Sequence, residues 1–185
     1  MKKHSILALI LSIALLTSCN IEQDPFQIAT QNVGNLNDST QVKDLKMVFA
    51  NDSIVTSVSG DEFSGSTNDI IVYEKGRKEL LVLSPSQSLD STATIRTVRV
   101  MDERYKTPKG LDTKSTFKAI RDNYKISSIQ NTLRNIIVSV DDINAYFTID
   151  KNELPAEMRF DMNLKIEAIH IPDDAKIKNF FIQWY

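Results

Sequence analysis

The chain has few of the residues on which most metal sites and many active sites depend. Its 185 residues include one cysteine, Cys19, and two histidines, His4 and His170. A single cysteine excludes a disulfide framework and a thiolate metal cluster within the chain. Two histidines, one of them in the fourth position, do not supply the multi-histidine zinc sites that many hydrolases use. We therefore expect neither a metal nor an organic cofactor.

Glycine is also scarce, and positive charge is not in excess. Five glycines leave no phosphate-binding loop, and no G-x-S-x-G nucleophile elbow occurs. A Ser/His/Asp triad would need His170 as its base. His170 lies between two isoleucines, where a polar position on a strand face is the simpler interpretation. The formal net charge of −2 argues against a nucleic-acid partner, because such proteins normally carry a basic surplus.

The N-terminus has the three-part layout of a secretory signal. A short basic head, Met1–His4, precedes an apolar run from Ile6 to Leu16, and small residues follow. A membrane-spanning helix is the alternative, but it needs about 20 apolar residues. The run here is shorter and is followed at once by a polar stretch, so we predict a cleaved signal peptide over 1–18.

Leu16-Thr17-Ser18-Cys19 resembles the lipobox of bacterial lipoproteins. The resemblance implies cleavage before Cys19 and a diacylglyceryl group on its sulfur, with a further fatty acid such as palmitate on the new amine. Two or three acyl chains make a stable anchor, whereas one is marginal. Asn20, rather than aspartate, follows the cysteine, and by analogy with the family this favours the outer membrane. We therefore expect lipidation at Cys19, a tether over 19–27 and a location in the cell envelope, with its leaflet left open.

The remainder contains an internal repeat in three ordered blocks. Residues 35–54 match 110–129 at an offset of 75, residues 68–80 match 144–154 at an offset of 76, and residues 94–102 match 165–173 at an offset of 71. Internal repeats set architecture. We therefore divide the mature chain into two related halves, 28–105 and 106–185.

Each half reads as a short helix followed by antiparallel strands. Apolar residues recur with helical spacing within 40–49 and 115–124, and Thr40 and Ser115 are suitable N-cap residues. Residues 69–74 and 145–150 are β-branched and aromatic, as strands require. Turns at 74–77 and 150–153 place Gly76 and Asn152 where a positive φ is easiest. Further strands are predicted over 95–100, 166–171 and 178–185.

These elements predict an α+β fold of two related halves, each a short helix packed on an antiparallel sheet. Thr107, Gly110, Ser115, Ile120 and Tyr124 resemble a signature of secreted bacterial domains. Small helix-on-sheet envelope lipoproteins and tandem-repeat β-lactamase inhibitor proteins are similar in architecture. These resemblances imply a fold and carry no catalytic residue to this chain.

Two surfaces are candidates for interaction. Basic residues recur at helical spacing beside the second apolar stripe, at Lys114, Lys118, Arg121 and Lys125, and they form either a solvated face or a contact for anionic headgroups or polysaccharide. The C-terminal segment, which ends in Trp184 and Tyr185, is the most aromatic. It is either a core strand or an edge strand offered to a partner.

Four acidic pairs, at 61–62, 102–103, 141–142 and 173–174, fall at expected strand ends or loops, where aspartate favours turns. We predict a non-enzymatic envelope lipoprotein that binds a protein or a polysaccharide. An inhibitor-like module against an external enzyme is one alternative. A carboxylate-based hydrolase is the other, because glycosidases need only two acids across a cleft.

Overall fold

The structure, a computed structural model, describes residues 24–59, 67–76 and 78–185. The leader, Cys19 and the acidic pair 61–62 lie outside the described residues. In the part of the chain that the structure describes, no helix is both long enough and apolar enough to span a membrane.

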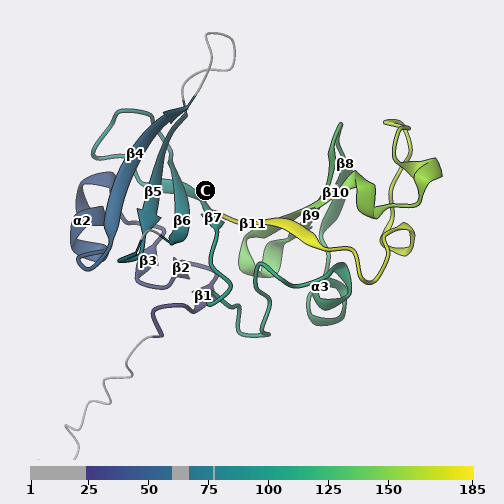
Figure 1. Cartoon of the computed structure of the whole chain (residues 1–185), viewed down its shortest axis with the longest axis horizontal. Coiled ribbons are helices and arrows are strands. Elements are labelled where there is room, and N and C mark those ends of the chain that lie inside the picture. The colour runs from purple at the N-terminus through teal and green to yellow at the C-terminus, as the bar shows by residue number, and fades with distance from the viewer. Residues whose placement is uncertain (1–23, 60–66, 77) are drawn as a thin grey trace, which may run out of the picture.

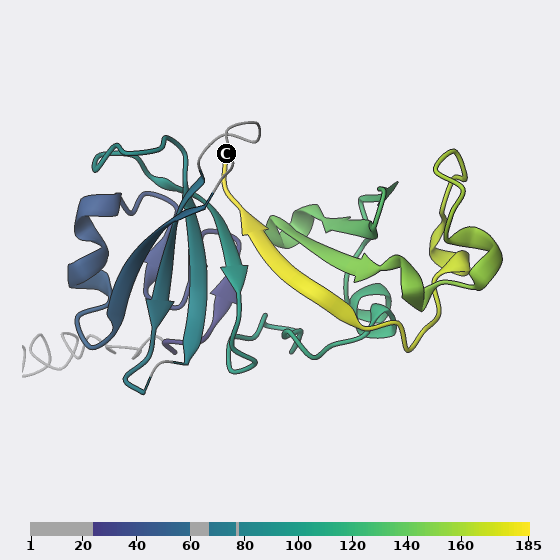
Figure 2. The same ribbon diagram turned by 45° about the horizontal axis from the view of Figure 1, so that its top comes forward.

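One antiparallel sheet of eight strands organises the molecule (Figure 1). The first four strands follow one another as a meander: β4 (Ser53–Ser59), β5 (Thr67–Tyr73), β6 (Glu79–Pro85) and β7 (Ile95–Val100). The last four are β8 (Ser128–Asn131), β9 (Asn135–Val140), β10 (Ala145–Asp150) and β11 (Ile177–Gln183). The order across the sheet is β4-β5-β6-β7-β11-β10-β9-β8, so the two meanders meet at β7 and β11. Figure 2 shows β11 as the long yellow strand that links the two groups.

Each meander is preceded by one short helical segment. A 3₁₀ turn, η2 (Val42–Asp44), leads into α2 (Leu45–Val48), and α3 spans Phe117–Asn123. Leu45 and Ile120, the central apolar residues of the two predicted stripes, are 2% and 0% exposed. The α+β class predicted from the sequence is thus the observed one.

Short elements complete the fold. The two-residue strands β1 (Ile28–Ala29), β2 (Asn32–Val33) and β3 (Leu36–Asn37) form a separate small sheet. Four 3₁₀ helices lie in the second half: η3 (Asp141–Ile143), η4 (Lys151–Glu153), η5 (Ala156–Met158) and η6 (Ala168–His170).

The predicted N-caps are wrong, but the error exposes a recurring motif. Neither Thr40 nor Ser115 caps its helix through the side chain. The Thr40 hydroxyl accepts from the Asn37 N–H at 3.1 Å and donates to Asn37 Oδ1. Ser115 does the same with Asp112, accepting from its N–H at 3.0 Å and donating to Oδ1. Both residues therefore close a turn immediately before the helix.

Backbone bonds recur in the same way. The Val42 N–H donates to Ala93 O, and the Phe117 N–H donates to Ala175 O. The Ile95 N–H donates to Thr40 O, and the Ile177 N–H donates to Ser115 O. The helix positions are related by an offset of 75 and the strand positions by one of 82. This recurrence is compatible with two related halves.

The predicted alignment of the strands, in contrast, is wrong for two of the three blocks. By its place in the sheet, β7 corresponds to β11 and not to 166–171, where the structure has irregular chain and η6 instead of a strand. The strand 69–74 is β5 and the strand 145–150 is β10, which stand second and third in their meanders. Alternating apolar strands resemble one another, so an alignment displaced by one strand keeps the pattern.

The second predicted turn is displaced for the same reason. Gly76 does have a positive φ, of 106°, between β5 and β6. Asn152, however, lies in η4, and the chain leaves the sheet there instead of folding back. The positive φ of the corresponding turn, between β9 and β10, is that of Asn144, at 50°. Asn144, which lies 68 residues after Gly76, is therefore the residue that corresponds to Gly76.

The two faces of the sheet differ in what covers them. One face carries residues such as Val72, Leu83, Val98, Phe147 and Phe180, which join the helix residues in one buried apolar cluster. Alternate residues point to the other face. Cross-strand neighbours on that face form a row over all eight strands, and none belongs to the buried cluster: Val55, Ile71, Val82, Arg99, Phe181, Tyr146, Ser139 and Ser128.

Candidate functional site

The C-terminal strand lies in the middle of the sheet. β11 pairs with β7 on one side and β10 on the other, so the edge-strand interpretation is wrong and the sheet edges are β4 and β8. Trp184 is 4% exposed, and its Nε1–H donates to Thr30 O at 3.0 Å. The indole therefore fastens the chain end to the small N-terminal sheet. Tyr185, by contrast, is 98% exposed.

Three aromatic residues form what we call the C-terminal aromatic surface: Tyr146, Phe181 and Tyr185. The rings of Tyr146 and Phe181 stack with centroids 4.6 Å apart and planes 11° from parallel. Burial, and to a smaller extent the nearby phenol of Tyr185, raise the pKa of Tyr146. At neutral pH the Tyr146 hydroxyl is therefore neutral and able to donate and accept hydrogen bonds.

The row on the face opposite the apolar cluster brings an arginine to these aromatics. Arg99 lies between Val82 and Phe181 in the register of the sheet. Its Nε is buried and has no hydrogen-bond partner. A buried donor without a partner is costly, but this atom has no exposed surface and is not itself a contact for a bound molecule.

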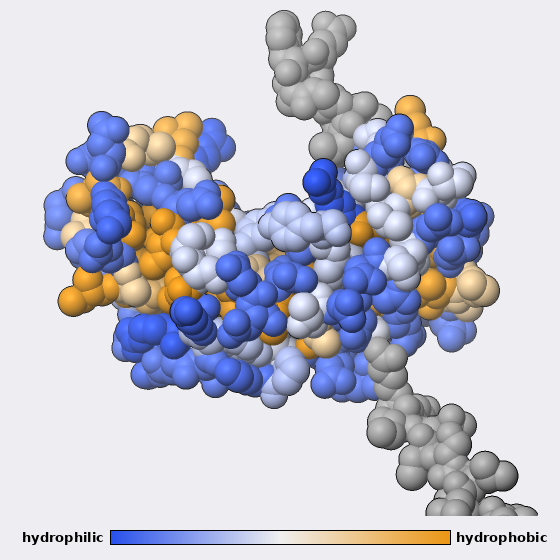
Figure 3. Space-filling model, turned by 180° about the vertical axis from the view of Figure 1, so that it is seen from behind, coloured by the Kyte–Doolittle hydropathy of each residue, from blue (hydrophilic) through white to orange (hydrophobic). Residues whose placement is uncertain are grey.

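Two hollows flank the chain end, and both are lined by Asn144 and Tyr185. The larger, of about 540 Å³, is also bordered by Asn32, Asp38 and Trp184. The smaller, of about 300 Å³, reaches Tyr146 and Asp141. Among the described residues, no lysine or arginine lines either hollow. Figure 1 marks the C-terminus between the two lobes, and Figure 3 shows the molecule from behind as two lobes with a depression between them.

The predicted basic stripe is not a helical stripe in the structure. α3 covers only 117–123, so Lys114 precedes it and Lys125 follows it. Lys118 is paired with Asp122, and Arg121 with Asp173 and Asp122. The charges on the helix itself are therefore compensated.

The remaining candidates for catalysis have structural partners. His170 closes a capping box, because its Nδ1 accepts from the Glu167 N–H at 3.1 Å. Asp173 is held by Arg121. Within the described ranges, no group of three or more His, Cys, Asp or Glu side chains is placed to hold a metal ion.

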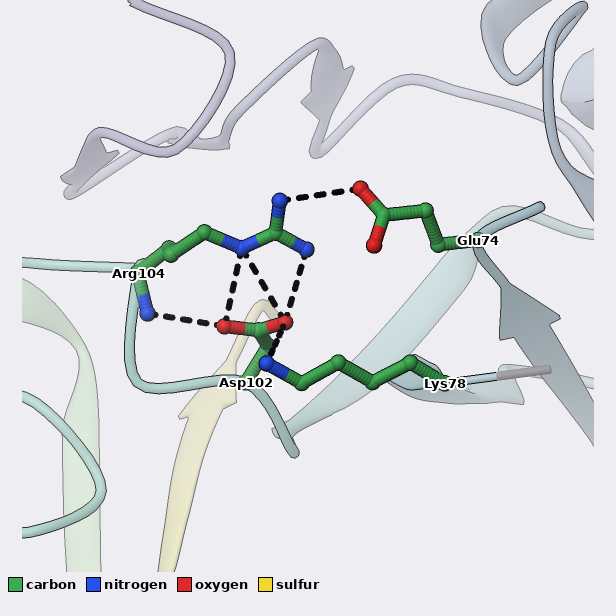
Figure 4. A network of polar contacts seen from close by, with 4 residues as sticks. All are labelled: Glu74, Lys78, Asp102 and Arg104. Atoms are coloured by element: carbon green, nitrogen blue, oxygen red, sulfur yellow. Dashed lines mark hydrogen bonds and ion pairs between the residues drawn. The ribbon is translucent and has the colours of Figure 1, made fainter. Parts of the chain in front are cut away.

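Asp102 is the most strongly perturbed carboxylate, and its surroundings are those of a structural clamp (Figure 4). Its side chain is fully buried, and Oδ2 lies 2.8 Å from Arg104 Nη2 and 2.9 Å from Lys78 Nζ. Burial alone would raise the pKa of Asp102, but the hydrogen bonds from Arg104 and Lys78 outweigh it and hold the pKa well below 3.8. Arg104 also binds Glu74.

The clamp joins the ends of three strands of the sheet. Glu74 follows β5, Lys78 precedes β6 and Asp102 follows β7. The Arg104 guanidinium lies 4.3 Å above the ring of Phe26, which packs edge-on against Tyr105. Every acceptor of Asp102 is thus engaged by the protein, which leaves no room for a substrate.

Sequence reasoning found Tyr185 but missed Tyr146, Phe181 and Arg99 as a group. The sequence gives little sign of this group, because each residue simply points away from the apolar cluster in a strand of ordinary alternating pattern. Only the order of strands in the sheet makes them neighbours.

Comparisons with known proteins support the fold and leave the function open. No protein-family model and no curated protein sequence matches the chain. A solved structure, that of the uncharacterized protein yfeY from Escherichia coli, is similar with a TM-score of 0.56 and 15% sequence identity. The similarity covers 85% of this chain and 99% of that one, and it shows a shared fold.

Proposed function

We propose that the mature chain is a non-enzymatic lipoprotein of the cell envelope that binds a protein partner through the face of its sheet opposite the apolar cluster. The observation that carries the proposal is the C-terminal aromatic surface, where an almost fully exposed Tyr185 stands beside the stacked Tyr146 and Phe181. Tyrosine and arginine are enriched among the residues that dominate protein–protein binding energy.

The length of the row opposite the apolar cluster favours a protein over a sugar as the partner. Strands are spaced about 4.8 Å apart, so the six residues from Val55 to Tyr146 extend over about 24 Å. A standard interface buries about 800 Å² on each partner, which is a patch about 28 Å across. A single sugar ring would cover one aromatic residue and leave the rest of the row uncovered.

The charges near the chain end indicate what the partner presents there. Asp38 and Asp141 border the two hollows, and the Tyr146 hydroxyl is neutral. A partner segment with a basic side chain fits such a rim, whereas an acidic segment is repelled. Specificity would then come from the rim and affinity from the aromatic centre.

Membrane attachment at Cys19 is part of the same proposal. The basic head, apolar run and lipobox occur in the order that lipoprotein maturation requires. Attachment would hold the binding face close to other components of the envelope.

The test is cross-linked capture of partners from envelope membranes with the full-length chain and two variants. Tyr185→Ala should lose the partner seen with the wild type. For a purified partner, its Kd should rise about 30-fold, which corresponds to a hot-spot cost of about 2 kcal/mol. Phe160→Ala is the matched control, because Phe160 is 89% exposed in the loop after η5, away from the surface.

Two results contradict the proposal. If Phe160→Ala loses the partner while Tyr185→Ala keeps it, the binding face is misassigned. If the captured material resists protease and is degraded by glycosidases, the partner is a polysaccharide and not a protein.

A further inference from the structure

We infer that a cavity at the seam between the two meanders binds the phosphate group of a small organic ligand. This cavity measures about 440 Å³ and lies where β7 ends and β11 begins. Lys114, Lys176 and Lys178 line it together with Thr113 and Asn179. The inference concerns a different site from the C-terminal aromatic surface and does not depend on the proposed function.

Backbone pairing brings the three lysines together. The segment before α3 runs antiparallel to the start of β11, with Thr116 opposite Lys176. The same register places Lys114 opposite Lys178. Lys176 lies immediately before β11 and Lys178 within it, and both line the cavity together with Lys114. In Figure 1 the chain leading into α3 passes close to the beginning of β11.

The charge of this cluster is incompletely compensated by the protein. Lys178 Nζ lies 2.8 Å from Asp150 Oδ2. Among the residues that the structure describes, the amines of Lys114 and Lys176 have no hydrogen-bond or ion-pair partner. Glu153 accepts from the backbone N–H of Lys176, and Asp112 accepts from that of Lys114 and pairs with Lys106. Cations that line one cavity repel one another, so an anion between them is favoured.

The fold itself does not require lysines here. At the offsets that relate the two halves, Lys114 corresponds to Ser39, Lys176 to Thr94 and Lys178 to Arg96. The first half therefore builds the same backbone pairing, with Gln41 opposite Thr94, around two neutral residues. The positive cluster is a property of the second half alone.

The donor set points to phosphate. Lysine amines bind phosphate as point charges, whereas bidentate recognition of planar carboxylates is typical of arginine. The Thr113 hydroxyl adds a further donor. The side-chain Nδ2–H of Asn179 donates to Thr148 Oγ1. The cavity falls within the range of 300–1,000 Å³ typical of small-molecule sites and exceeds what one phosphate fills. Ile177 offers an apolar contact to the rest of the ligand.

The test is titration calorimetry of the full chain in detergent with glycerol 3-phosphate, with succinate as the carboxylate comparison. Wild type should bind glycerol 3-phosphate at least tenfold more tightly than succinate, and binding should weaken as salt is raised. Lys114→Gln and Lys176→Gln should each raise the Kd at least tenfold. Lys125→Gln is the matched control, since it removes an exposed lysine outside the cavity, and should leave the Kd unchanged.

Thermal unfolding supplies a second readout. Without ligand, Lys114→Gln should unfold at the same or a higher temperature than wild type, because it relieves repulsion. With glycerol 3-phosphate, only wild type and Lys125→Gln should gain stability. Flotation with phosphatidylglycerol or phosphatidylcholine vesicles shows whether the phosphate is that of a lipid headgroup. If neither the soluble phosphate nor the vesicles bind, or if succinate binds equally well, the inference is overturned.

Discussion

At the scale of single residues, Asp102 shows how one buried charge can hold distant segments. Its carboxylate accepts from Arg104 and Lys78, and both cations are themselves partly solvated. Replacing it with a neutral group leaves Arg104 in place but removes the acceptor that joins the ends of β5, β6 and β7. The residue has the perturbed pKa of a catalytic group and the full set of partners of a structural one.

Asp102→Asn should lower the free energy of unfolding by about 3 kcal/mol. This is the low end for breaking a buried ion pair, because Arg104 and Lys78 keep part of their hydration. Urea unfolding at pH 7 measures it, and Glu103→Gln, an exposed neighbour, should change it by less than about 0.5 kcal/mol.

The same residue predicts a pH dependence. Because the folded-state pKa of Asp102 lies below 3.8, its contribution is complete above that value and is lost as the pH falls through the folded pKa. The stability difference between wild type and Asp102→Asn should therefore be constant near neutrality and shrink below about pH 4. A difference that grows on acidification would contradict the assignment.

Gly34 makes a second prediction at this scale. Its φ is +57°, and a Cβ there would lie 2.1 Å from Pro25 O. Gly34→Ala should therefore cost clearly more than Gly110→Ala, where φ is +81° but no atom lies within 4 Å. The left-handed backbone alone costs about 1–2 kcal/mol, and equal urea midpoints would mean that the contact with Pro25 relaxes freely.

At the scale of elements, the short helical segments depend on the sheet for their stability. Seven residues from Val42 to Val48 and seven from Phe117 to Asn123 are too few to be helical alone in water. Their apolar stripes are buried against the strands, and the turns at Thr40 and Ser115 set where they begin.

Leu45→Ala and Ile120→Ala should each cost about 2–5 kcal/mol, the range for truncating buried aliphatic side chains. Lys118→Ala, on the exposed side of α3, should cost less than about 0.5 kcal/mol, because its pairing with Asp122 is a surface one. Chemical denaturation of the three variants measures these free energies of unfolding. Similar losses of stability at all three positions would mean that the helix is oriented differently.

At the scale of the whole molecule, the two meanders share one sheet and one apolar cluster. The apolar core therefore continues across the seam between β7 and β11. Exposed apolar side chains outside the face opposite the apolar cluster occur in both halves, and apolar residues are prominent on the second-half lobe in Figure 3. They are Met47 and Leu89 in the first half and Leu133, Phe160, Met162 and Ile169 in the second.

Membrane attachment is a property of the whole chain and is tested at one residue. Cys19→Ser removes the thiol that would accept the diacylglyceryl group. The precursor should then accumulate unprocessed and incorporate no labelled palmitate, whereas Asn20→Ala should be labelled like wild type. Labelling of Cys19→Ser would disprove the lipobox assignment.

The sequence by itself was sufficient for the fold class, the two helical segments and the burial of Leu45 and Ile120, because those depend on local periodicity. Two features were decided only by tertiary pairing: residues 166–171 form no strand, and the strand 145–150 does not correspond to the strand 69–74. The reason is that alternating strands are interchangeable by pattern, while the 26 residues between β10 and β11 replace a connection of nine between β6 and β7. The same applies to the candidate sites. Tyr146, Phe181 and Arg99, like Lys114 and Lys178, are distant in the chain and become neighbours only through the register of the sheet.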